Sequence, residues 1–446
     1  MSRFKQVVAS AFLLGVLWIF LLLSRVLFIE SDNTNNLYIP EEAEAVIILN
    51  GNHLLEHTFE DVILKTRDNQ IIKLIAARLK KTKEQTEGFN IGIDLNSDII
   101  LFTLERDNGS FIGVLFNLND EEAFKTNIPK IIDSAMQGFA ATNNVGLILQ
   151  QSDSTLSKKA LNQLSEAILL KSKKLPVEQL RKQQEEVTIA SLTITKNADL
   201  APFKMGVDLT LELHDGNIKL EGDVSWDKNA INSKGFEVLK PEGFHFSSSL
   251  IPEELNDSLQ SYFGSTLPKL TAISFNLMGS ELVEQPSVVL VPSMDMILHF
   301  EEPTPAFLLT SKLSDNSRAD GGQPRDVFMF GGKQFYFKNL SPNVVYIGHS
   351  PYKTSKTLDE NYLLLAKGDL SVFTKVEGTG MIRRFLEILS IYSAGRDFTE
   401  RTKNFDLTIL KTANGKGIIS GEIQFKDGRY ATNEVIKLLL NGKLLQ

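Results

Sequence analysis

Apolar and polar residues alternate with a period of two in several stretches of the chain, and this alternation predicts half-buried β-strands. It is clear over residues 45–49 and 273–277, and two apolar runs within 99–116 flank an Asp-Asn-Gly turn. Helical spacing is rarer: Leu161, Leu164 and Ile168 follow i, i+3, i+7 and predict one amphipathic helix. Helices and strands mix without regular βαβ alternation, so we predict an α+β fold with largely antiparallel sheets.

The N-terminal segment has a different pattern. Val7 to Ser24 is free of charged residues and would span about 27 Å as a helix, close to the thickness of a bilayer core. Lysine and arginine precede this run and acidic residues follow it, which predicts a cytoplasmic N-terminus. A cleaved signal peptide is the alternative, but no small-residue cleavage site follows the run. We therefore expect a cytoplasmic tip and transmembrane helix over 1–30, in the bilayer through residues 7–28, and a linker over 31–37.

Two stretches of the remaining chain align without a gap and predict an internal duplication. Residues 39–56 and 267–284 each pass a proline (Pro40 and Pro268), an apolar strand and a glycine (Gly51 and Gly279). We expect each glycine to lead into a short helix. The sequence therefore predicts similar units over 38–235 and 267–446, with a connector over 236–266.

The ends of the two predicted units also match. Strands that begin near residues 207 and 405 reach the turns Asp215-Gly216 and Asn414-Gly415, dipeptides that favour hairpins. Both return strands, at 222–226 and 421–425, read small, acidic, β-branched, polar and aromatic. We expect the two hairpins to be equivalent.

Composition limits the chemistry that we expect. The chain has 446 residues, a net charge of −8 and no cysteine. The absence of cysteine excludes disulfides and thiolate sites, and the charge does not favour nucleic-acid binding. Phenylalanine is abundant, with 28 residues against 8 tyrosines. Core packing explains this abundance, and an apolar groove for a lipid or peptide is the alternative.

The predicted anchor, the proline-led strand and the Gly-rich acidic hairpin resemble those of certain duplicated bacterial envelope proteins of unknown function. The resemblance implies a bacterial inner-membrane protein that crosses once, with most of the chain in the periplasm. It supplies no catalytic residues.

One motif suggests catalysis. His53, Glu56 and His57 form an H-x-x-E-H sequence, the spacing by which inverted zinc peptidases bind metal and activate water. A third ligand is required, and Glu121, Glu122 and Asp133 form no convincing ligand pattern. The aligned second stretch keeps the acid as Glu284 and lacks both histidines. We therefore expect no metal, cofactor or catalytic residue here.

The sequence thus predicts a membrane-anchored, non-catalytic binding or scaffolding protein of the bacterial envelope, with an unidentified envelope protein as its partner. A groove-forming carrier or sensor for lipid or envelope polymer is the first alternative. A zinc peptidase that uses residues 53–57 is the second.

Overall fold

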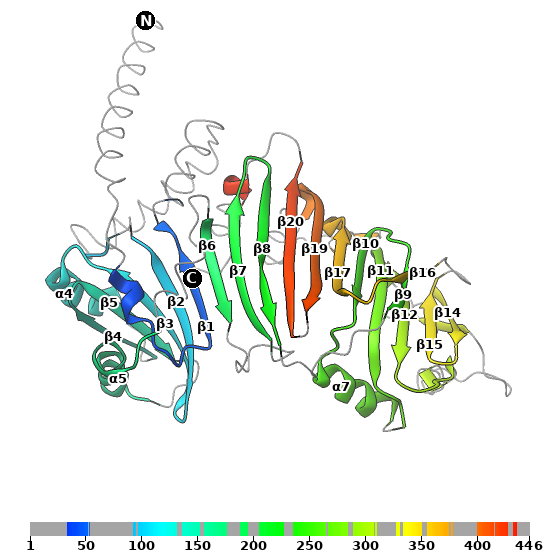
Figure 1. The fold of residues 1–446 in the computed structure, drawn as a ribbon, viewed down its shortest axis with the longest axis horizontal. Helices are drawn as coiled ribbons and strands as arrows, with labels where there is room; N and C mark the ends of the chain where they lie inside the picture. Colours follow the sequence, from blue (N-terminus) through cyan, green and yellow to red (C-terminus); the bar gives the residue numbers. More distant parts are fainter. Residues whose placement is uncertain are drawn as a thin grey trace, which may run out of the picture. The chain divides into compact units, whose positions relative to one another are not determined.

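The computed structural model describes part of the chain, and the account below concerns these residues alone. They are 34–51, 53, 92–94, 97–131, 136–151, 156–175, 188–194, 205–226, 235–264, 266–283, 289–306, 308–309, 327–330, 333–349, 355–373, 376–377, 399–413, 415–426 and 431–434. They belong to two compact units, Met1–Leu192 and Thr193–Gln446 (Figure 1). Each unit is described by itself.

The predicted fold class is wrong. The described residues form mostly antiparallel β-sheet, so the α+β description fails. Three α-helices are defined in this part of the chain: α4 (Glu121–Ile131), α5 (Lys158–Lys171) and α7 (Glu253–Phe263). None of the described helices is both long and apolar enough to cross a membrane. The helix predicted over residues 7–28 lies outside the described residues.

Unit 1 is built on a five-strand antiparallel order, β1-β2-β3-β5-β4. Its strands are β1 (Ala45–Leu49), β2 (Ile99–Arg106), β3 (Gly109–Asn117), β4 (Gln137–Thr142), β5 (Val145–Gln151) and β6 (Thr188–Ile194), preceded by the 3-10 helix η1 (Thr34–Tyr38). The predicted hairpin around the Asp-Asn-Gly turn is therefore confirmed as β2–β3. The predicted helix at 161–168 is confirmed as α5, which buries Leu161 and Ile168 against the sheet. Ser157 caps its first turn by accepting a hydrogen bond from the amide of Ala160.

Unit 2 contains the remaining elements. Its strands are β7 (Gly206–Leu213), β8 (Asn217–Ser225), β9 (Phe236–Leu239), β10 (Phe244–Ser248), β11 (Leu270–Val283), β12 (Val289–Phe300), β13 (Val327–Phe330), β14 (Lys333–Ser341), β15 (Val344–Gly348), β16 (Ser355–Leu358), β17 (Tyr362–Gly368), β18 (Val376–Glu377), β19 (Thr402–Ala413) and β20 (Lys416–Phe425). A short 3-10 helix, η3 (Leu370–Phe373), follows β17. The segment 236–266, expected as a connector, thus supplies β9, β10 and α7. Leu308 and Leu309 are helical.

The strand order of unit 1 recurs in unit 2. The strands β10-β11-β12-β15-β14 are antiparallel neighbours in the same arrangement as β1-β2-β3-β5-β4. This order makes β10 the counterpart of β1 and β11 the counterpart of β2. We expected residues 46–49, in β1, to be equivalent to residues 274–277, which lie in β11. By strand order, however, the counterpart of β1 is β10, the neighbour of β11.

The position of Gly279 within its strand accounts for this wrong alignment. Gly279 does not end a strand: it lies at a β-bulge inside β11, with φ +134°, and the strand continues to Val283. The expected helix after Gly279 is therefore wrong. Helix α7 instead follows β10.

The two predicted hairpins have equivalent registers. Leu209 faces Gly222 in β7–β8, and Leu407 faces Gly421 in β19–β20. The hairpins lie side by side because β8 pairs antiparallel with β20 (Figure 1). In that pairing Gly222 faces Ile419, and its equivalent Gly421 faces Leu220, the equivalent of Ile419. Each hairpin therefore makes the same contact with the other that the other makes with it, as in an isologous interface. This symmetry favours an internal duplication.

Candidate binding cavity

Unit 2 contains a cavity of about 370 Å³ that is lined only by apolar side chains. Strand β12 supplies one wall with Met294, Met296 and Leu298, which point to the same face because alternate residues of a strand share a face. Phe335 and Phe337 of β14 extend that wall. The abundance of phenylalanine thus serves a cavity as well as a packed core.

Helix α7 covers the opposite side. Leu255, Leu259 and Phe263 repeat every four residues, so they lie along one stripe of the helix and line the cavity. Leu255 is 37% exposed, so the cavity lining reaches the molecular surface there.

Two side-chain amides hold α7 in place. Asn256 accepts a hydrogen bond from the Leu270 amide at 2.7 Å and donates one to the Leu270 carbonyl at 3.3 Å. One turn later, Gln260 donates to the Leu267 carbonyl at 2.9 Å. These bonds satisfy backbone groups at the start of β11, so the helix is attached by polar contacts beside an apolar cavity.

The other face of the sheet carries a buried polar chain under β9. His245 and Ser247 of β10 lie opposite Asn276 and Ser274 of β11, and all four are fully buried. His245 Nδ1 lies 2.7 Å from Asn276 Oδ1, and its Nε2 lies 2.8 Å from Ser247 Oγ. The Ser247 hydroxyl in turn lies 2.9 Å from that of Ser274.

The contacts of Asn276 fix the orientation of its amide in this chain. Asn276 donates its amide protons to the Lys240 carbonyl at 2.8 Å, so its Oδ1 accepts from His245 Nδ1–H. The Ser247 hydroxyl donates to the Ser274 hydroxyl and lies beside His245 Nε2. Burial lowers the pKa of His245, and this outweighs the hydrogen bond to Asn276, which raises it.

The order Ser247–His245–Asn276 resembles the hydrogen-bond order of a nucleophilic triad. A nucleophile must reach its substrate, whereas the Ser247 hydroxyl is fully buried beneath β9. We therefore interpret the chain as a structural link between β9, β10 and β11. The alternating polar positions 245, 247, 274 and 276 were the sequence signal for it, and our sequence analysis missed them.

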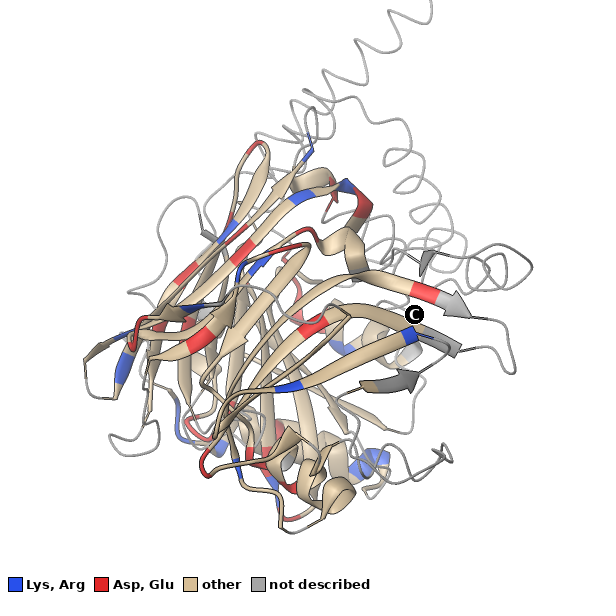
Figure 2. Cartoon of the chain, turned by 90° about the vertical axis from the view of Figure 1, so that its right-hand side faces the viewer, with Lys and Arg blue, Asp and Glu red and all other residues tan. Residues whose placement is uncertain are grey.

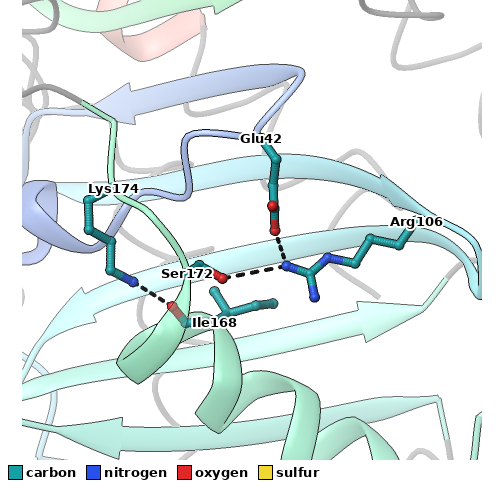
Figure 3. A network of polar contacts seen from close by, with 5 residues as sticks. All are labelled: Glu42, Arg106, Ile168, Ser172 and Lys174. Atoms are coloured by element: carbon teal, nitrogen blue, oxygen red, sulfur yellow. Dashed lines mark hydrogen bonds and ion pairs between the residues drawn. The ribbon is translucent and has the colours of Figure 1, made fainter.

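A second polar network lies in unit 1, at the C-terminal end of α5 (Figure 3). Arg106 forms an ion pair with Glu42 and approaches the Ser172 hydroxyl at 3.5 Å. Lys174 donates to the Ile168 carbonyl at 2.5 Å, which places a cation at the negative end of the helix. Burial lowers the pKa of Lys174. The network ties α5 to the segment before β1 and to the β2–β3 hairpin.

The H-x-x-E-H motif is described only in part. His53 lies in a helical turn that Asn50 caps, since the Asn50 side chain accepts from the His53 amide at 3.1 Å. Glu56 and His57 lie outside the described residues, as do Asp133 and Glu284. Across the described ranges, no group of three or more histidine and carboxylate side chains could hold a metal. That His53 and His57 bind no catalytic metal stays a prediction.

Glu121 has partners of its own in helix α4. Its carboxylate accepts from Lys125 at 2.6 Å and from the Asn144 amide at 3.1 Å. The hydrogen bond from Lys125 lowers the pKa of Glu121. Asp120 caps the same helix by accepting from the Ala123 amide. Glu121 therefore belongs to the attachment of α4.

Acidic and basic residues are interspersed over the described strands, and most of the ribbon is uncharged (Figure 2).

Comparison with known proteins gives few matches. No family model and no curated protein matches the chain. Crystal form I of TP0453, a Treponema envelope protein of unknown function, shares 11% identity with a TM-score of 0.24, over 46% of this chain and 88% of that one. Crystal form III shares 9% identity with a TM-score of 0.18, over 74% of this chain and 95% of that one. The chain thus has a weak structural resemblance to TP0453.

Proposed function

We propose that this protein is a non-catalytic binding protein of the bacterial cell envelope whose unit 2 holds the hydrocarbon chain of a lipid. The observation that carries the proposal is the cavity between α7 and the sheet, whose lining is entirely apolar. Its volume of about 370 Å³ lies within the range of small-molecule sites, which is about 300–1,000 Å³.

The apolar lining favours a hydrocarbon ligand over water. A water molecule in a cavity needs two to four polar partners, and the side chains that line this one offer none. Hydrocarbon needs no partners and regains the dispersion contacts that an empty cavity loses. Met294 and Met296 add flexible side chains that adapt to a ligand of variable shape.

The sequence supports the location. The charge-free run from Val7 to Ser24 suits attachment to the inner membrane, and the charges around it suit a periplasmic position for the rest. A tethered domain with an apolar cavity would meet its ligand in the adjacent bilayer. Scaffolding for an envelope protein partner remains compatible with the same placement.

Photo-crosslinking of the full-length chain in membranes tests the proposal. The probe is hexadecanol that carries a diazirine in its chain, because this neutral molecule tests the cavity alone. We expect adducts on peptides of α7 and β12. Leu259→Trp and Met296→Trp, which fill the cavity from opposite walls, should remove these adducts.

Leu170→Trp is the matched control, since it adds the same ring at a position of α5 that is 64% exposed. It should leave the adducts unchanged. Circular dichroism confirms that each variant is folded. Absence of cavity adducts in the wild type, or adducts that persist in both folded cavity variants, would overturn the proposal.

A further inference from the structure

Polar side chains gather at one end of the cavity. Lys333 precedes Phe335 by two residues on β14, so both side chains leave the strand on the same face, and Phe335 lines the cavity. The ring of His349 lies 4.1 Å from the Phe335 ring. His349 Nε2 lies 2.9 Å from the carbonyl of Pro292, another lining residue. Lys333 and His349 therefore adjoin the apolar lining at the same end.

Both groups suit a negative ligand. His349 Nδ1 also lies 3.2 Å from the Gln334 carbonyl, so its two ring nitrogens both face acceptors. An imidazole N–H is a hydrogen-bond donor, so His349 brings a donor to this end of the cavity. Lys333 forms an ion pair with Glu281, and the two side chains are 32% and 40% exposed. A solvent-exposed pair of this kind contributes little stability and exchanges partners at small cost.

We propose that the ligand is a single-chain amphiphile with an anionic headgroup, a carboxylate or a phosphate, which Lys333 and His349 hold at this end of the cavity. The inference rests on the proposed function, because the hydrocarbon chain occupies the apolar cavity. On binding, the headgroup takes the place of Glu281 beside Lys333 and of the Gln334 carbonyl beside His349 Nδ1, and the displaced carboxylate and carbonyl become hydrated. A charge-assisted hydrogen bond to the ammonium is stronger than one between neutral groups, so an anion binds more tightly than an alcohol of equal chain length.

Competition against the diazirine-bearing hexadecanol tests the headgroup. Palmitate, hexadecyl phosphate and hexadecanol are titrated as competitors, with the full-length chain held in an amphipathic polymer. We expect one or both anions to compete about fivefold better than hexadecanol, as one charge-assisted contact would provide. The better of the two anions identifies the headgroup.

Lys333→Gln should bring the anions within about twofold of hexadecanol, because the cation is lost. Lys338→Gln, the same change on the opposite face of β14, should keep the preference. The readout is a ratio between competitors in one variant, so a general loss of stability does not mimic the result. His349→Gln gives a second variant, with a smaller preference expected.

Equal competition by all three molecules in the wild type would overturn the headgroup site and leave the hydrocarbon cavity standing. A preference that survives in both Lys333→Gln and His349→Gln would also overturn it. If the wild type gives no cavity adducts at all, the proposed function fails, and the headgroup site fails with it.

Discussion

Lowering the pH from 7.5 to 5.5 should destabilise unit 2 through two buried histidines. Burial lowers the pKa of His245 and of His299, which is 9% exposed and whose Nε2 lies 2.8 Å from the Glu237 carbonyl. The lysines at 356 and 367 lower the pKa of His245 further, whereas Glu237 raises that of His299. The unfolded chain therefore takes up protons first as the pH falls.

The direction and the size of the change in stability follow from the linkage between protonation and folding. Stability is full above the unfolded pKa of about 6.5 and is lost as the pH falls toward the lower folded values. If a histidine stays neutral in the folded state, the unfolded state gains about 1.4 kcal/mol between pH 7.5 and 5.5. Two such histidines give an upper limit of about 2.7 kcal/mol.

Urea unfolding at pH 5.5, 6.5 and 7.5 measures the effect. The full-length chain carries Trp18→Phe, which leaves Trp226, buried in unit 2, as the reporter of that unit. His245→Gln should unfold more easily at pH 7.5, because the polar chain loses a partner, by about 1–3 kcal/mol. Its further loss at pH 5.5 should be about half that of the wild type.

Ile418→Gln is the control, since this side chain of β20 is 47% exposed and the change involves no titratable group, so the pH response should not change. The reasoning is refuted if His245→Gln loses as much stability on acidification as the wild type does. It is also refuted if the wild type gains stability as the pH falls.

Further predictions concern single positions. Gly222→Ala should destabilise the chain by about 1–3 kcal/mol in thermal or urea unfolding, because the new Cβ would lie 1.9 Å from a backbone oxygen. Gly216→Ala is the control: it has open space around it and should destabilise the chain by less than about 0.5 kcal/mol. Asn256→Ala should speed amide hydrogen exchange in α7 but not in α5, because it removes two hydrogen bonds that contribute about 1–3 kcal/mol together. Equal exchange rates of α7 in the wild type and the variant would contradict the proposed attachment of this helix. Replacement of His53 and His57 by Gln should change stability by less than about 0.5 kcal/mol, and stoichiometric zinc lost in this double variant would overturn that expectation. Protease added to spheroplasts should degrade the folded part of the chain, and full protection would exclude a periplasmic location.

Local sequence determined the hairpins and helix α5. A glycine-containing turn between alternating strands fixes which residues pair, so the β2–β3, β7–β8 and β19–β20 hairpins could be predicted from short windows. The spacing of Leu161 and Ile168 likewise defines one buried helical face. These features depend on neighbours within about ten residues, and the sequence contains that information.

Tertiary structure decided the rest. Gly279 was predicted to end a strand and lead into a helix, but pairing with β12 continues through it as a bulge, so one long antiparallel strand forms there instead. The cavity requires side chains of α7, β12 and β14, which are far apart in the sequence. The burial that lowers the pKa of His245 likewise depends on β11 and β17, the strands that pair with β10 on its two sides. Packing between distant segments follows from strand order and register, and no single window of sequence specifies either.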